Sequence, residues 1–168
     1  MQKPKFVEDE IYHVYNRGVE KRDVFMEDKD YFRFIHDLFE FNDVESASNL
    51  TFYFNSKTMH NEPQQLKNKR NPRKLLVEIL AFCLMPNHFH ILLKQKKENG
   101  IVRFMQKMGV GYTNYFNEKN KRVGPLFQGK FKAVLTKTDA HMLHLPFYIH
   151  ANPLSLNYGN PTSIVGEL

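Results

Sequence analysis

Residues 83–94 have the sequence Cys-Leu-Met-Pro-Asn-His-Phe-His-Ile-Leu-Leu-Lys, which is the most informative segment of the chain. Two histidines, His88 and His90, flank the bulky apolar Phe89 at the start of an apolar run. Side chains alternate between the two faces of a strand, so His88 and His90 are expected on one face and Phe89 on the other. Two imidazoles at this spacing can bind one metal ion. Taken alone, such a pair more often lies on a solvated sheet face, because imidazole is a common surface group.

The neighbouring residues predict an antiparallel hairpin and two further strands. Residues 75–85 are strand-like, and Pro-Asn at 86–87 suits a tight turn that returns the chain into residues 88–94. Residues 10–15 are rich in β-branched and aromatic side chains and end at a turn signal, Asn-Arg-Gly. Residues 131–136 alternate in character, which predicts a fourth strand.

Three helices are expected between and after these strands. The first extends from an N-cap at Asp28 to about residue 42, and the second spans residues 98–117; apolar side chains recur at helical spacing in both. The third begins near residue 138 and ends at or before Asn152, because Pro153 cannot continue a helix. This order predicts an α+β protein with a ferredoxin-like split βαβ sandwich, in which helices cover one face of an antiparallel sheet.

Composition indicates a globular domain with an excess of positive charge. The 168 residues suffice for one domain with a substantial core. The net charge is +6, and the chain contains 15 Phe and 8 Tyr but no Trp. A basic, aromatic-rich protein suits a polyanion whose bases can stack on its rings, such as single-stranded nucleic acid. A basic domain with an aromatic core and no nucleic-acid partner fits the same composition.

Cysteine usage and hydropathy favour a cytoplasmic protein. The single cysteine, Cys83, excludes an internal disulfide and a multi-cysteine zinc module, and its apolar surroundings predict a buried thiol. The first ten residues contain no apolar segment typical of a signal peptide. The longest apolar run, residues 75–86, is too short to cross a bilayer.

A polar segment at residues 55–74 contains six Lys or Arg and one Glu. We expect an exposed basic excursion of a single domain spanning residues 1–168, because too little chain precedes the segment to form a separate core. Such a segment can follow a phosphate backbone, or it can simply be solvated.

A second group of candidate residues lies in the third expected helix. Tyr148 and Asn152 are four residues apart and share one helix face, with His144 on the same stripe. A tyrosine hydroxyl beside a metal-bound phosphate can attack phosphorus in line, and an amide oxygen can complete a two-histidine metal site. Taken alone, however, Tyr148 is better explained by aromatic packing and Asn152 by an ordinary helix C-terminus. Tyr112 and Tyr115 are competing nucleophiles, but their helical spacing predicts a place in the core.

Five motifs, in this order, resemble those of the single-tyrosine HUH transposases, and among these the REP-associated tyrosine transposases. They are Tyr-His-Val-Tyr-Asn-Arg-Gly (12–18), Met-Pro-Asn-His-Phe-His-Ile-Leu-Leu (85–93), Tyr-Thr-Asn-Tyr-Phe-Asn (112–117), Gly-Pro-Leu-Phe-Gln-Gly-Lys-Phe-Lys-Ala (124–133) and Tyr-Ile-His-Ala-Asn-Pro (148–153). The resemblance covers residues 12–153 apart from the basic excursion.

The resemblance implies a transposase that cleaves and rejoins single-stranded DNA at hairpin-forming repeats. It implies His88, His90 and Asn152 as ligands of a divalent metal, Mg²⁺ or Mn²⁺, and Tyr148 as the nucleophile on a C-terminal catalytic helix. The implied intermediate is a 5′-phosphotyrosine with a free 3′-hydroxyl on the other fragment. The implied partner is single-stranded or hairpin DNA, bound by a monomer or a homodimer.

Arg17, Lys130 and Lys132 flank the expected strands and are candidates for phosphate contacts, although each can be an ordinary surface charge. The main alternative function is a non-catalytic single-stranded nucleic-acid-binding protein on the same fold, and a weaker one is a small metal hydrolase of another phosphodiester. Pro146 departs from the family pattern, because a proline two residues before Tyr148 is expected to kink or restart the helix.

Overall fold

The computed structural model describes residues 4–45, 52–54, 61–63, 72–136 and 164–166. Its centre is the predicted hairpin, formed by β4 (Val77–Met85) and β5 (His88–Gln95), in which Met85 pairs with His88 across the two-residue turn. β1 (Ile11–Arg17) pairs antiparallel with β5, and β6 (Lys132–Leu135) pairs antiparallel with β1. A fifth strand that the sequence did not predict, β7 (Ile164–Gly166), pairs antiparallel with β4.

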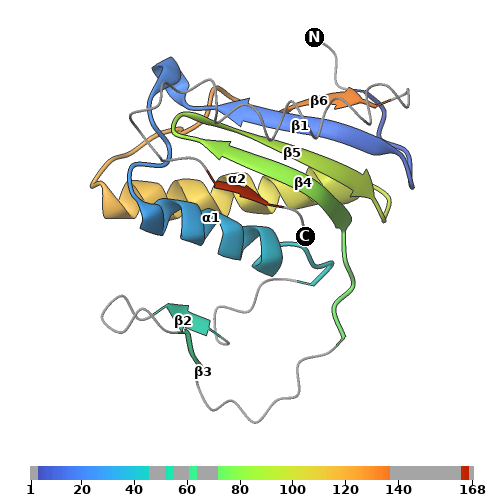
Figure 1. The fold of residues 1–168 in the computed structure, drawn as a ribbon, viewed down its shortest axis with the longest axis horizontal. Coiled ribbons are helices and arrows are strands. Elements are labelled where there is room, and N and C mark those ends of the chain that lie inside the picture. Colours follow the sequence, from blue (N-terminus) through green and yellow to red (C-terminus); the bar gives the residue numbers. More distant parts are fainter. Residues whose placement is uncertain (1–3, 46–51, 55–60, 64–71, 137–163, 167–168) are drawn as a thin grey trace.

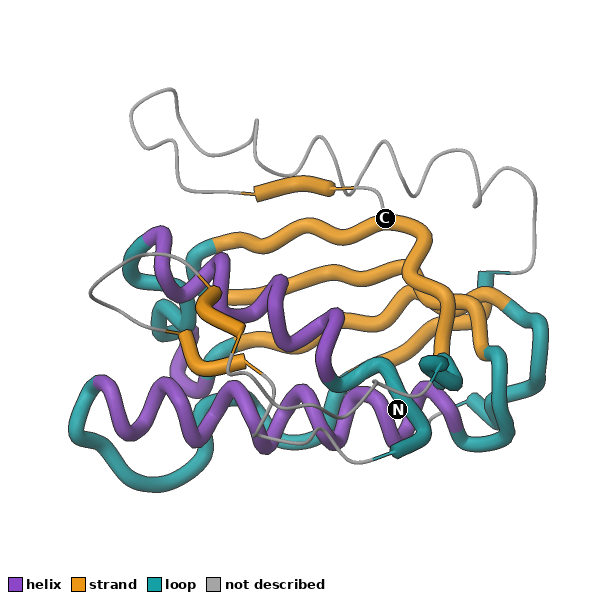
Figure 2. Tube along the Cα trace, turned by 90° about the horizontal axis from the view of Figure 1, so that it is seen from below, coloured by secondary structure: helices purple, strands orange, loops and turns teal. Residues whose placement is uncertain are grey.

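The strand order β6-β1-β5-β4-β7 contains the arrangement expected for a ferredoxin-like sheet. Two helices, α1 (Asp28–Glu40) and α2 (Gly100–Lys119), lie side by side on the same face of this sheet (Figures 1 and 2). The prediction of an α+β sandwich with helices on one face is therefore confirmed. Outside the sheet, the described residues also form a short 3-10 helix, η1 (Val19–Lys21), and a two-stranded ribbon of β2 (Phe52–Phe54) and β3 (Asn61–Pro63).

The main core lies between the helices and the sheet. Strands β1 and β5 contribute alternate apolar side chains and helices α1 and α2 contribute helically spaced ones, which are buried: Tyr12, Val14, Phe34, Leu38, Phe89, Ile91, Leu93, Phe104, Met108 and Tyr112. A second, smaller cluster is buried on the opposite face of the sheet and consists of Ala81, Cys83, Met85 and Leu92. Cys83 is fully buried, as predicted, and this burial raises the pKa of its thiol to about 11.

Several element bounds differ from the prediction, among them those of β1 and α1. β1 continues through Asn16 and Arg17 because these residues pair with Phe89 and His88, which outweighs the local turn signal. The N-cap of α1 is Glu27 rather than Asp28, because the Asp30 carboxylate accepts hydrogen bonds from the backbone N–H groups of Met26 and Glu27. α1 also ends at Glu40, two residues earlier than expected.

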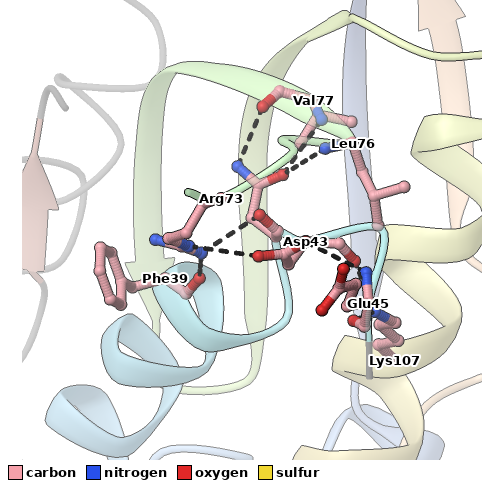
Figure 3. A network of polar contacts seen from close by, with 8 residues as sticks. Phe39, Asp43, Glu45, Arg73, Leu76, Val77 and Lys107 are labelled. Carbon is pink, nitrogen blue, oxygen red and sulfur yellow. Dashed lines mark hydrogen bonds and ion pairs between the residues drawn. The ribbon is translucent and has the colours of Figure 1, made fainter. Parts of the chain in front are cut away.

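A polar network fastens the end of α1 to the start of β4 (Figure 3). The buried Asn42 side chain donates to the carbonyl of Val77 and accepts from the backbone N–H groups of Leu76 and Val77. Arg73 donates to the carbonyl of Phe39 and pairs with Asp43. Arg73 therefore has a structural role, although it belongs to the segment that was predicted to be an exposed basic excursion.

Candidate functional site

His88 and His90 lie together on the face of the sheet opposite α1 and α2. Phe89 and Ile91, which alternate with them along β5, are 2% and 0% exposed in the core under the helices. The two imidazole centroids are 5.0 Å apart, and both side chains are half-buried. The predicted shared face is therefore present, with the two rings close enough to approach one ion.

β1 supplies two further aromatic side chains beside this pair, because Tyr15 pairs with His90 and His13 pairs with Leu92. The His13 ring stacks on His90 with centroids 5.0 Å apart, and its Nε2 atom lies 2.8 Å from Nδ1 of His90. The Tyr15 ring stacks on the His90 ring with centroids 5.7 Å apart, and it is tilted against the His13 ring, 5.2 Å away. His13 and Tyr15 were not predicted as site residues, although their alternation in the first strand was a usable signal.

Asn87, in the hairpin turn, contacts the first histidine. Its Oδ1 atom lies 2.6 Å from Nδ1 of His88, and its Nδ2 atom donates to the carbonyl of Lys21 over 3.2 Å. The turn is therefore attached both to the histidine pair and to η1.

The local environment keeps the three histidines uncharged near neutral pH. Burial lowers the pKa of His13 to about 4. Burial, with the neighbouring His13 and His88, lowers the pKa of His90 to about 3. Burial and the Arg17 guanidinium lower the pKa of His88. A neutral imidazole has one unprotonated nitrogen with a free lone pair, and this neutral form is the one that binds a metal ion.

These pKa values predict that acid destabilises the fold. Above pH 6.5 the histidines are neutral in both the folded and the unfolded chain; below it, the unfolded chain binds protons that the folded chain excludes. The free energy of unfolding is therefore expected to fall as the pH drops from about 6.5 towards 4. Denaturant titrations at pH 7.5 and 5 measure this loss, which should be smaller in His13→Phe than in wild type. Equal losses in the two proteins would contradict it.

The donor set fits a divalent transition metal only in part. His88 and His90 supply two nitrogen ligands, a set that suits several divalent metals. Among the described residues, no group of three or more His, Cys, Asp or Glu side chains could hold a metal ion. Further ligands must therefore come from residues of another type or from outside the described segments. Asn152, the predicted third ligand, lies outside them, as do Tyr148, His144 and Pro146.

The structure separates the competing tyrosines from the histidine pair. Tyr112 is 0% exposed in the core on the helix side of the sheet, and its hydroxyl donates to the carbonyl of Val24 over 2.6 Å. The hydroxyl of Tyr115 donates to the buried carboxylate of Asp30 over 2.9 Å. Burial first, and then Asp30, raises the pKa of both phenols, which disfavours the phenolate that an attack on phosphorus needs.

Two of the three candidate phosphate contacts lie on the same face as the histidines. Arg17 pairs with His88, and Lys132 pairs with Tyr15, which in turn pairs with His90. Both cations are exposed, and no ion pair joins either to a carboxylate within the described segments. Lys130 instead lines a cavity of about 690 Å³ between α2 and residues 125–131, on the helix side of the sheet. The structure therefore brings Arg17 and Lys132, but not Lys130, to the histidine face.

No helix in the described part of the chain is long and apolar enough to cross a membrane.

Comparisons with known proteins agree with the arrangement of these elements. The protein family described as "Transposase IS200 like" matches residues 48–152, which is more than half of the chain. A solved structure of a REP-associated tyrosine transposase bound to a REP hairpin aligns with a TM-score of 0.59 and 10% sequence identity, covering 94% of this chain and 74% of that one. At this identity, the likeness shows a common fold. No curated protein matched the sequence. The family match and the common fold together establish that this chain belongs to the IS200-like transposases.

Proposed function

We propose that this protein is a metal-dependent endonuclease and strand transferase of single-stranded DNA, acting in the cytoplasm on hairpin-forming repeats. The observation that carries the proposal is the placement of His88 and His90 side by side on one face of the sheet, with ring centroids 5.0 Å apart, in a chain of a transposase family. The structural neighbour, itself bound to a REP hairpin, supports DNA of this type as the substrate.

In the proposed reaction, the hydroxyl oxygen of Tyr148 attacks a backbone phosphorus and the bond from phosphorus to the 3′ oxygen breaks. The tyrosine proton ends on the departing 3′ oxygen, so that one fragment has a 3′-hydroxyl and the other is joined to the protein as a 5′-phosphotyrosine. Attack by a 3′-hydroxyl on this phosphotyrosine reverses the step and rejoins DNA without a nucleoside triphosphate. His88, His90 and Asn152 would hold the Mg²⁺ or Mn²⁺ ion, which would stabilise the charge that develops on the phosphoryl oxygens.

The charges around the pair support a polyanionic substrate. Arg17 and Lys132 are exposed cations on the histidine face, where they can contact phosphates on either side of the cleaved bond. Tyr15 adds a half-buried ring on which an unpaired base can stack. The same groups also suit the alternative function, a non-catalytic single-stranded nucleic-acid binder, so that covalent chemistry must separate the two.

The proposal predicts a covalent protein–DNA adduct with defined polarity. Wild-type protein, Mn²⁺ and a single-stranded hairpin with flanking sequence should give an adduct that survives denaturation. The adduct should carry a label placed at the 3′ end of the DNA, whereas a label at the 5′ end should appear in a shorter free strand that a polymerase can extend. Denaturing gel electrophoresis measures both products.

Two controls make this experiment decisive. Omitting Mn²⁺ and adding a chelator should remove the adduct, and the same sequence as a perfect duplex should give none. If the protein binds a panel of DNA hairpins tightly but forms no adduct with any of them, the proposed enzymatic function is overturned in favour of the non-catalytic binder. An adduct that carries the 5′ label would overturn the proposed polarity.

A further inference from the structure

Each histidine of the pair has its Nδ1 atom held by a neighbouring side chain. Nδ1 of His88 lies 2.6 Å from Oδ1 of Asn87, and Nδ1 of His90 lies 2.8 Å from Nε2 of His13. An imidazole has two nitrogens, and a neutral ring carries a proton on one and a lone pair on the other. The two contacts therefore bear on which nitrogen of each ring carries the proton.

The contact of His88 has one consistent set of donors and acceptors. The carbonyl of Lys21 only accepts, so the amide nitrogen Nδ2 of Asn87 must face it, 3.2 Å away. This places Oδ1 of Asn87, which also only accepts, toward His88. Nδ1 of His88 must then carry the proton, and the lone pair is on Nε2.

The contact between His90 and His13 allows two arrangements of the proton, and they differ in which nitrogen of His90 carries the lone pair. If Nδ1–H of His90 donates to Nε2 of His13, the lone pair of His90 is on Nε2, as in His88. If Nε2–H of His13 donates instead, Nε2 of His90 carries a proton and cannot bind a metal ion. Only the first arrangement allows both histidines to bind one ion through the same nitrogen. The stacked ring of His13, half-buried on β1, restricts the rotation of His90 in either case.

We propose that Asn87 and His13 are positioning residues that hold His88 and His90 in the same tautomer, with the proton on Nδ1 and the lone pair on Nε2, the form in which each ring can bind a divalent cation through Nε2. The proposal rests on the metal site proposed above, and it assigns neither Asn87 nor His13 as a ligand. Partners of this kind fix the ring and the tautomer of metal-binding histidines in many proteins, and their loss typically lowers metal affinity by about 10–100-fold.

The tautomers are measured first, in metal-free protein labelled with ¹⁵N histidine. Two-dimensional NMR that correlates ring nitrogens and carbons should show a protonated Nδ1 and an unprotonated Nε2 for both His88 and His90. In Asn87→Ala and His13→Phe, the signals of the corresponding ring should shift toward a mixture of tautomers. A protonated Nε2 on either histidine of the wild-type protein would overturn the proposal.

Metal affinity is measured next, by calorimetric titration with Mn²⁺. His13→Phe and Asn87→Ala should each bind about 10–100-fold more weakly than wild type. His13→Gln and Asn87→Asp should recover most of the affinity, because each keeps an acceptor oxygen for the Nδ1–H group. Unchanged Mn²⁺ affinity in His13→Phe would overturn the positioning role. If His13→Gln lost Mn²⁺ affinity as completely as His90→Ala, His13 would be a ligand, and the positioning role would be overturned as well.

The two measurements separate this inference from the proposed function. If the wild-type protein binds no Mn²⁺, the metal site itself fails, whereas the tautomers of the metal-free protein still decide what Asn87 and His13 do. Thermal unfolding followed by circular dichroism establishes that each variant is folded before either measurement is interpreted.

Discussion

Tyr148→Phe is expected to abolish the covalent protein–DNA adduct, while Tyr112→Phe and Tyr115→Phe retain it. Phenylalanine keeps the ring but lacks the oxygen that would form the bond to phosphorus, so the loss should be complete rather than partial. The structure strengthens the contrast, because the hydroxyls of Tyr112 and Tyr115 are engaged on the helix side of the sheet, by the carbonyl of Val24 and the carboxylate of Asp30.

The two control substitutions are expected to affect stability instead of chemistry. Tyr112→Phe leaves the buried carbonyl of Val24 without this donor, and Tyr115→Phe removes one donor from Asp30, which Lys119 still neutralises. Each should lower the free energy of unfolding by about 1–3 kcal/mol, measured by denaturant titration. Adduct yield is therefore compared at a temperature at which all variants are fully folded.

Tyr15→Phe is the most informative of the other tyrosine substitutions. Among the described residues it is the tyrosine beside the histidine pair, with its ring centroid 5.7 Å from that of His90. Tyr15→Phe should keep the adduct, because we assign Tyr15 to stacking. Loss of the adduct in Tyr15→Phe together with its retention in Tyr148→Phe would move the nucleophile from the C-terminal segment to β1.

Local patterns were sufficient for the central hairpin, the two helices and the shared face of His88 and His90. Pro86 and Asn87 separate two strand-like runs, so the turn and the pairing follow from adjacent residues. Alternation along one strand is also local, and it placed Phe89 in the core and the two histidines opposite it.

The rest of the site depends on contacts between distant segments. His13 reaches His90 only because β1 pairs with β5 in a particular register, across 77 residues of sequence. Nothing in either strand alone specifies that register. The sequence therefore indicated the two predicted ligands, but not the side chain that contacts one of them. β1 was also predicted too short for this reason, since the pairing of Arg17 with His88 extends it.

The composition of residues 55–74 gave no sign that one of their basic side chains has a structural role. Arg73 belongs to a run that looked uniformly solvated, yet its guanidinium lies over the Phe39 ring and bonds to the end of α1. A count of basic residues cannot identify the one that lies within reach of a helix C-terminus, where carbonyl groups lack intrahelical partners. Tyr148, Asn152 and Pro146 lie outside the described residues, so the roles assigned to them stay predictions.

His88→Ala and His90→Ala are each expected to lower the rate of adduct formation by about 10³-fold or more. A metal ion that stabilises developing phosphoryl charge contributes several kcal/mol to the transition state, and each 1.36 kcal/mol corresponds to a factor of ten in rate. Both variants should also lose Mn²⁺ binding by calorimetry. The fold should tolerate the changes, because both side chains are half-buried outside the main core.

His36→Ala is the matched control for this pair. His36 is a half-buried histidine on α1, and α1 lies on the face of the sheet opposite His88 and His90. Its removal should leave the rate and the Mn²⁺ affinity unchanged. If His88→Ala and His90→Ala bind Mn²⁺ as wild type does and form the adduct at the wild-type rate, the histidine pair is not the metal site. Loss of DNA binding in both variants, with Mn²⁺ affinity intact, would instead assign the pair to substrate contact.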